Sequence, residues 1–203
     1  LAALWAGASG KAAETLLMTA VSHLRHALNL YAPDAMFITT GNRCYTLDFG
    51  PHAEIDFLDF KQLMREAQTA STDDVRQRVS AAQRENKYRA AVALYAGEFL
   101  REDAFEEWTS FERESLMDAY LHAMTFLSHR ELTGDRLSDA ITLAYQMLRQ
   151  DALCENAYEI LFTALRRGEK SAEMKRVYQQ CKVAFRRELD AEPPSRLTEL
   201  ALR

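Results

Sequence analysis

Residues 123–144 (AMTFLSHRELTGDRLSDAITLA) and residues 157–178 (AYEILFTALRRGEKSAEMKRVY) decide the fold of this chain. Gly134-Asp135 in the first segment and Gly168-Glu169 in the second lie 34 positions apart. The same offset aligns small and apolar residues: Ala123 with Ala157, Phe126 with Ile160, Leu127 with Leu161, and Ala144 with Tyr178. Each segment predicts a helix, a turn with glycine and a second helix. One such hairpin cannot bury its own apolar face, so we expect the units to stack.

The 34-residue offset is the period of tetratricopeptide-like helix pairs. Small residues such as Ala140 and Ala144 allow paired helices to approach closely. Residues 87–97 (KYRAAVALYAG) look like the second helix of an earlier, divergent unit. The alternative is a generic antiparallel helical bundle, and the repeat offset favours the stacked repeat over it.

The remainder of the chain from Glu54 onward also predicts helices. We expect a helix over 56–70, and a second one that follows the capping cluster 71–73, breaks near Asn86 and reaches about Tyr95. Further helices are expected over 105–132, 137–150, 155–167 and 172–189, with Ser195 capping a short last helix.

The N-terminal part has a different character. Residues 11–29 predict a helix whose apolar stripe of Leu17, Val21, Leu24 and Leu28 we expect to be buried. Residues 36–50 (MFITTGNRCYTLDFG) predict a β-hairpin, since strand-forming residues flank a Gly-Asn turn. The fold class is therefore mainly α, with one hairpin before the helical repeat.

Composition limits the class of protein. Hydrophobic residues make up 48% and charged residues 27% of the 203, with 7 Gly and 4 Pro, which is typical of a soluble helical protein. Cys44, Cys154 and Cys181 lack metal-site spacing, and we expect reduced thiols in a cytoplasmic protein. No apolar run approaches the roughly 20 residues of a membrane helix, and no signal peptide opens the sequence. It begins at Leu1, inside an apolar stretch, and we expect it to be part of a longer protein.

The sequence predicts no enzyme, no cofactor and no metal site. The acidic run 102–107 has no histidine or other polar partner nearby in the sequence, and it suits the start of a helix. No GxxxxGK phosphate loop is present. The aromatics Phe99, Phe105, Trp108 and Phe111 are interpreted as core or inter-repeat packing, with a partner or ligand pocket as the alternative.

Two runs in the N-terminal part resemble a known family: 17–28 (LMTAVSHLRHAL) and 38–47 (ITTGNRCYTL). The first aligns without a gap with the recognition helix, and the second with the wing, of the OmpR/PhoB-type winged-helix DNA-binding domain, so residues 1–50 resemble the C-terminal part of that domain. The segment 1–6 (LAALWA) resembles the end of the preceding helix. The sequence departs from the family at Cys44 and Thr46, where the wing usually has Gly and Arg, and at Met18 and Ala20, where polar residues are frequent.

A second resemblance lies in the helical part of the chain. It is found in 90–97 (AAVALYAG), 107–108 with 112–114, 132–135, 151–157, and 185–189 before 192–194. Through these segments, residues 54–203 resemble the bacterial transcriptional activator domain of SARP-type regulators. The resemblance implies tetratricopeptide-like helices that support oligomerisation, such as a homodimer, or contact with RNA polymerase and other protein partners.

A winged helix implies a specific set of DNA-contacting residues, because it places one helix in the major groove and its hairpin on the minor groove or backbone. We expect base-edge contacts from Thr15, Met18, Thr19 and Ser22, phosphate contacts from Lys11, His23, Arg25 and His26, and a minor-groove or phosphate contact from Arg43. The alternative is that these are ordinary solvated surface side chains.

The sequence thus predicts a cytoplasmic regulator that binds promoter double-stranded DNA. The rival hypothesis is a helical-repeat interaction scaffold with a winged-helix remnant that does not bind DNA. The net charge of −5 and the equal numbers of acidic and basic residues in 1–50 favour this rival, whereas the recognition-helix and wing pattern favours the regulator.

Overall fold

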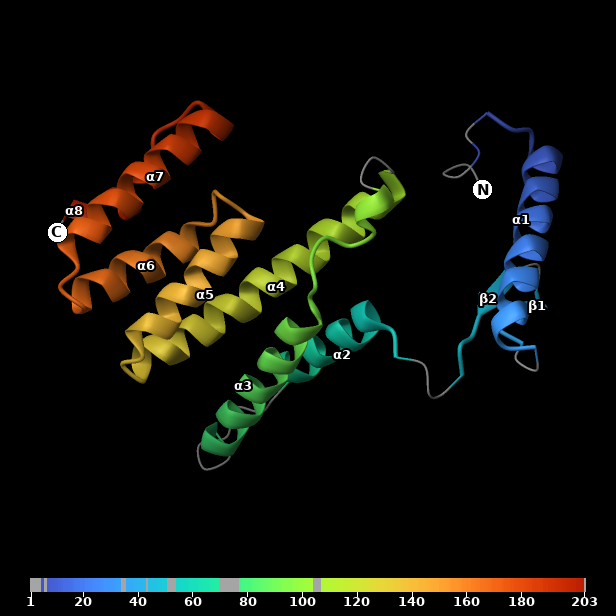
Figure 1. Ribbon diagram of the computed structural model, residues 1–203, viewed down its shortest axis with the longest axis horizontal. Helices are drawn as coiled ribbons and strands as arrows, with labels where there is room; N and C mark the ends of the chain where they lie inside the picture. The colour runs from blue at the N-terminus through green and yellow to red at the C-terminus, as the bar shows by residue number, and fades with distance from the viewer. Residues whose placement is uncertain are drawn as a thin grey trace. The chain divides into compact units, whose positions relative to one another are not determined.

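The computed structural model describes residues 5, 7–33, 36–42, 44–50, 54–69, 77–103 and 107–202, and their side chains except those of 77–80 and 103. The chain divides into two compact units (Figure 1). The first contains Leu1–Ile55 and Phe105–Trp108, and the second is built from Asp56–Ala104 and Thr109–Arg203. Each unit is described by itself below.

The first unit combines one long helix with a hairpin. Helix α1 spans Gly10–Tyr31, and strands β1 (Ile38–Gly41) and β2 (Cys44–Leu47) follow it. The strands are antiparallel, with Ile38 opposite Leu47 and Gly41 opposite Cys44. Asn42 occupies the turn with a φ of 49°, a left-handed conformation that asparagine tolerates. The predicted helix and hairpin are both confirmed.

The predicted burial of the apolar stripe of α1 is wrong at Leu24, which is 47% exposed. Leu17, Val21 and Leu28 are only half-buried, and Ala13 is the one buried residue of the helix. The reason is length. A 22-residue helix extends for about 33 Å, whereas a four-residue strand extends for about 13 Å and covers only part of it.

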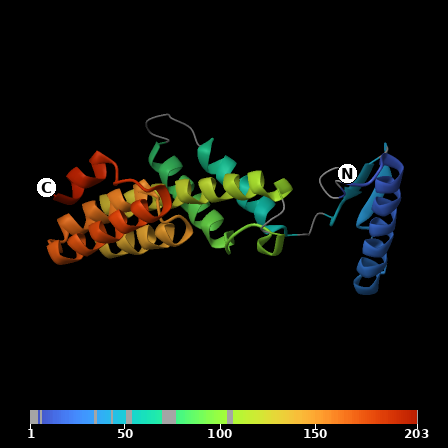
Figure 2. The ribbon, with the colours of Figure 1, turned by 90° about the horizontal axis from the view of Figure 1, so that it is seen from above.

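The second unit is entirely helical in its described residues (Figures 1 and 2). Its elements are α2 (Asp56–Gln68), α3 (Gln77–Leu94), the 3₁₀ turn η1 (Arg101–Asp103), α4 (Glu107–Thr133), α5 (Leu137–Gln150), α6 (Glu155–Arg167), α7 (Ser171–Leu189) and α8 (Ser195–Leu202). Helix α2 packs on α3, α6 packs on both α5 and α7, and α8 contacts α6 and α7. The predicted bounds of α5 and α6 are confirmed. The predicted break near Asn86 is wrong, because Asn86 lies on the solvent side of a continuous helix that buries Tyr88 and Ala91.

The core of the second unit follows the repeat. Two of the pairs aligned by the 34-residue offset are buried at both positions, Ala123 with Ala157 and Leu127 with Leu161. In the other two pairs, Ile160 and Ala144 are buried and their partners Phe126 and Tyr178 are half-buried. Ala140, Ala144 and Ala164 have no exposed surface. A residue without a long side chain at these positions lets neighbouring helices approach closely, as the sequence predicts.

The two repeat turns share one geometry. Arg136 N–H donates to the Glu131 carbonyl and Asp135 N–H to the Leu132 carbonyl, and the second turn repeats this pattern from Lys170 to Leu165 and from Glu169 to Arg166. This is the Schellman motif, in which one residue adopts a left-handed conformation that glycine prefers. Here that residue is Asp135 (φ 57°) or Glu169 (φ 54°), one position after the glycine in each turn.

Replacing Glu169 with glycine is expected to raise the free energy of unfolding by about 0.5–1 kcal/mol, because glycine removes the steric cost of a positive φ. Glu169→Ala is the matched control, since it removes the same carboxylate and keeps a Cβ in the same conformation. Urea denaturation followed by circular dichroism measures both variants. Equal stability of the glycine and alanine variants would contradict this account of the turn.

Candidate functional site

The face of α1 that the sequence assigns to DNA is exposed to solvent. Lys11, Thr15, Ser22 and His26 follow one another at helical spacing along it. Met18, Thr19 and His23 lie beside them and are exposed as well, Met18 at 63%. The structure therefore gathers seven of the nine predicted contact residues on one accessible surface.

Two hydroxyl groups on this face are bonded to the helix itself. Thr15 Oγ1 donates to the Lys11 carbonyl at 3.0 Å, and Thr19 Oγ1 donates to the Thr15 carbonyl at 2.9 Å. A hydroxyl has a single proton to donate, but it keeps lone pairs that accept hydrogen bonds. In this arrangement both threonines present acceptors to a ligand on the outer side of the helix.

Arg25 has a different set of contacts from the phosphate contact that the sequence predicts. Its Nη2 donates to the Ile38 carbonyl at 3.0 Å and to Thr40 Oγ1 at 2.8 Å, and its Nε donates to the Ile38 carbonyl at 3.2 Å. The guanidinium also lies 5.8 Å from the centre of the Tyr45 ring. Arg25 thus fixes the hairpin on α1, and the sequence interpretation missed this positioning role.

Arg25→Ala is expected to loosen the hairpin on the helix by about 1–2 kcal/mol, because the variant loses three charge-assisted hydrogen bonds. Hydrogen exchange of the amides in 38–47 is the measurement, and about tenfold faster exchange is expected. His26→Ala is the control, since this neighbouring side chain is exposed. Unchanged exchange in the Arg25 variant would show that other contacts hold the hairpin.

Arg43, the ninth predicted contact residue, lies outside the described residues. Phe105 of the predicted aromatic cluster lies outside them as well. The structure does not bring the other three aromatics into one packed cluster. Phe99 packs on Phe57 with ring centres 5.1 Å apart, whereas Trp108 is 47% exposed and Phe111 is 81% exposed.

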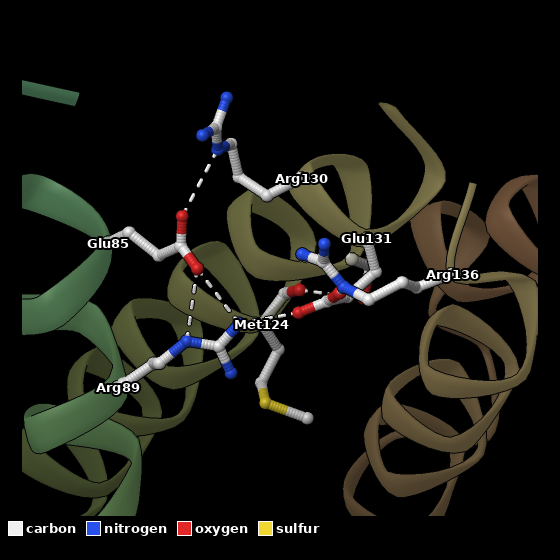
Figure 3. Close-up of polar contacts among 7 residues, drawn as sticks. Glu85, Arg89, Met124, Arg130, Glu131 and Arg136 are labelled. Atoms are coloured by element: carbon white, nitrogen blue, oxygen red, sulfur yellow. Dashed lines mark hydrogen bonds and ion pairs between the residues drawn. The ribbon is translucent and has the colours of Figure 1, made fainter. Parts of the chain in front are cut away.

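A polar cluster in the second unit joins the divergent first helix pair to the repeat (Figure 3). The Glu131 carboxylate of α4 is 4% exposed. It accepts hydrogen bonds from Arg89 of α3 and from Arg136 in the following turn. Glu85 of α3 accepts from Arg89 at 2.9 Å and from Arg130 of α4 at 3.2 Å. The five side chains therefore tie α3, α4 and the turn before α5 together.

The electrostatics of this cluster keep Glu131 ionised. Burial alone would raise the pKa of Glu131, but the hydrogen bonds from Arg136 and Arg89 outweigh it and leave the pKa below its ordinary value. The sequence contains a signal for this residue that the interpretation missed. The 34-residue offset aligns Glu131 with Leu165, which is fully buried, so a carboxylate stands at a core position of the repeat.

The described residues contain no group of three or more histidine, cysteine or carboxylate side chains placed to hold a metal ion. Within the same residues, no helix combines the length and the apolar character that a membrane crossing needs. Burial raises the pKa of the Cys181 thiol to about 12 and also raises that of Cys154, so these two cysteines are thiols at neutral pH.

Comparison with known proteins gives a family for the second unit. Residues 55–203 match the family described as "Bacterial transcriptional activator domain". No curated protein matches the chain. The matched range covers all helices of the second unit, α2 to α8, and does not include 1–54, so the winged-helix resemblance of the first unit stays a prediction. The chain belongs to the bacterial transcriptional activator domain family.

Proposed function

We propose that this protein is a DNA-binding transcription activator of the cytoplasm, without enzymatic activity. Helix α1 contacts promoter double-stranded DNA in the major groove, and the hairpin contacts the minor groove or backbone. The helical repeats mediate oligomerisation or contact RNA polymerase. The observation that carries the proposal is the exposed polar face of α1, fixed to a hairpin by Arg25, in a chain that belongs to an activator family.

The chemistry of α1 indicates which bases it prefers. Thr15 and Thr19, acting as acceptors, suit the amino groups of cytosine and adenine at the edge of the major groove. Met18 suits the methyl group of thymine, and Ser22 can donate or accept. Lys11, His23 and His26 are assigned to phosphates, and Arg43 to the minor groove or backbone.

A second candidate function is an interaction scaffold whose N-terminal unit does not bind DNA. Its support is the charge, because acidic and basic residues are equal in number over 1–50 and the chain as a whole carries −5. Binding by a neutral surface lacks the counterion release that provides most non-specific affinity.

Selection from a random pool of duplex DNA separates the two functions. The regulator predicts enrichment of a spaced sequence motif, and Thr19→Val is expected to lose that preference because valine keeps the shape but has no acceptor. Lack of enrichment, with weak binding that vanishes at moderate salt, would support the scaffold.

Arg43→Ala is expected to weaken binding equally on all DNA sequences. Each phosphate contact contributes about 0.9 to the slope of log affinity against log salt, so the slope should become shallower by about that amount. Fluorescence anisotropy at several salt concentrations, on the enriched and on a scrambled duplex, measures this. An effect confined to one base position would assign Arg43 to base recognition instead.

A further inference from the structure

The first turns of α4 expose an aromatic side chain between carboxylates. Glu107, Phe111, Glu114 and Asp118 follow one another at spacings of four, three and four residues, and all are exposed. We call them the acidic stripe. Phe111, at the centre of the acidic stripe, is 81% exposed. Exposure of a phenylalanine ring to water does not stabilise the fold, so this exposed side chain needs another explanation. Arg113, on the same turns, donates instead to the Phe99 and Leu100 carbonyls and to Thr109 Oγ1.

A complementary surface lies on α5 and α7. A groove of about 530 Å³ runs between these helices, and its lining contains no carboxylate. Apolar residues line it, among them Leu148, Ala152 and Ala184, together with Gln180 and Arg149. On α7 the exposed residues Arg176, Val183 and Arg187 extend the same surface. We call the groove with these three residues the basic groove.

The cations of the basic groove are available to a partner. Within the described part of the chain, Arg149 and Arg176 form no ion pair, and Arg187 pairs only with the adjacent, exposed Glu188. Burial raises the pKa of Tyr145, which lines the groove, and the charge of Glu173 adds to this, while Arg176 opposes both. Lys170 lies 3.9 Å from Glu173 and balances it.

The two surfaces match in length and pattern as well as in charge. Glu107 to Asp118 and Arg176 to Arg187 each extend over about 16 Å of helix. Each has charged residues at its ends and an apolar residue, Phe111 or Val183, between them. Within the second unit, α7 lies apart from the N-terminal half of α4 in both views (Figures 1 and 2), so the two surfaces do not meet within one molecule.

We propose that the acidic stripe of one copy of this chain docks in the basic groove of a second copy. Phe111 enters between α5 and α7, and its flanking carboxylates meet Arg149, Arg176 and Arg187. The contact joins two different surfaces, so it is heterologous and assembles molecules head to tail. This inference specifies the oligomerisation part of the proposed function, but it does not require DNA binding.

Sedimentation velocity of the full chain without DNA tests the contact. At low salt, the wild type is expected to associate within a range of protein concentrations that extends to roughly 200 µM. It is expected to dissociate as the salt concentration rises, because salt screens the charged pairs that flank Phe111. Two double variants reverse the charge of one surface each: Glu107→Lys/Glu114→Lys changes the acidic stripe, and Arg149→Glu/Arg176→Glu changes the basic groove. Each variant is expected to need at least about tenfold higher protein concentration for the same degree of association. Phe111→Ser is expected to need at least about thirtyfold more.

The decisive measurement uses an equal mixture of the two charge-reversed variants. Neither variant has complementary surfaces of its own. In the mixture, the reversed stripe of one variant can bind the reversed groove of the other, and the native stripe of the second can bind the native groove of the first. Association is therefore expected to return in the mixture alone. The controls are Arg65→Glu/Arg101→Glu, which lowers the net charge as much as Arg149→Glu/Arg176→Glu does, and Leu202→Ser, which removes another exposed apolar side chain.

Three outcomes would overturn the proposal: a monomeric wild type at low salt, variants that associate like the wild type, or a mixture that does not recover. Circular dichroism of each variant distinguishes loss of association from loss of fold. Because no DNA is present, a negative result in this experiment would not contradict the DNA-binding proposal, which the DNA selection tests. A negative result in the DNA selection would likewise not contradict the proposed contact between copies.

Discussion

Replacing Phe162 with alanine is expected to lower the free energy of unfolding by about 3–5 kcal/mol. Phe162 has no exposed surface and lies on α6, which packs against α5, α7 and α8. Its ring lies 6.2 Å from those of Tyr158 and Tyr178. Truncation removes the transfer free energy of the ring and leaves a cavity that these helices close only in part. The total free energy of unfolding of a domain of this size is about 5–15 kcal/mol, so the substitution removes a large share of it.

Phe111→Ala is the matched control for this prediction, because it deletes the same atoms from a side chain that is 81% exposed. It is expected to change stability by no more than about 0.5 kcal/mol. Urea denaturation at a concentration where the wild type is monomeric measures both variants. Similar losses for the two would mean that burial in the repeat does not determine the stability of the second unit.

The helical repeat was predictable from the sequence because its determinants are local and periodic. Ala157 and Leu161 recur at the offset that Ala123 and Leu127 set, and both pairs are buried. Prediction failed where a distant contact overrides a local preference. Asn86 has weak helix propensity, yet burial of Tyr88 and Ala91 on the other side of α3 keeps the helix continuous.

The sequence predicted that the candidate DNA-contacting face is exposed, but it did not predict the hydrogen bonds of the residues on and beside that face. Helical spacing is sufficient to show that Thr15, Thr19 and Ser22 share a face. It does not show that Arg25 points to the Ile38 carbonyl, because that contact depends on how the hairpin folds back on α1. The same holds for Leu24, whose exposure depends on how much of the helix the hairpin covers.

The basic groove could not be found from the sequence for a similar reason. Arg149 and Arg176 belong to different helix pairs, and only the stacking of α5, α6 and α7 brings their surfaces together. By contrast, the acidic stripe lies on a single helix, and its spacing was available in the sequence. The interpretation assigned Phe111 to packing, as aromatic residues generally are, and the structure shows it in solvent.

Glu131→Gln is expected to lower the free energy of unfolding by about 2 kcal/mol at pH 7. The variant keeps the size of the side chain but leaves the Arg136 guanidinium without a carboxylate among the described residues, and it leaves Arg89 with Glu85 as its only carboxylate partner there. Breaking a fully buried pair costs about 3–5 kcal/mol. Both arginines keep about half of their side-chain surface exposed, so water replaces part of the lost interaction. Glu188→Gln, which removes an exposed carboxylate, is the control and should cost no more than about 0.5 kcal/mol.

The pH dependence distinguishes a charged Glu131 from a merely well-packed one. The folded protein holds the pKa of Glu131 below its ordinary value of 4.5, so ionised Glu131 stabilises the fold above that pH. As the pH falls through the folded pKa, the carboxylate is protonated and this contribution disappears. The difference in unfolding free energy between wild type and Glu131→Gln should therefore be largest near pH 7 and shrink below pH 4.5. A difference that stays constant with pH would assign the loss to packing of the amide, and the arginines would then hold α3, α4 and the turn before α5 without help from its charge.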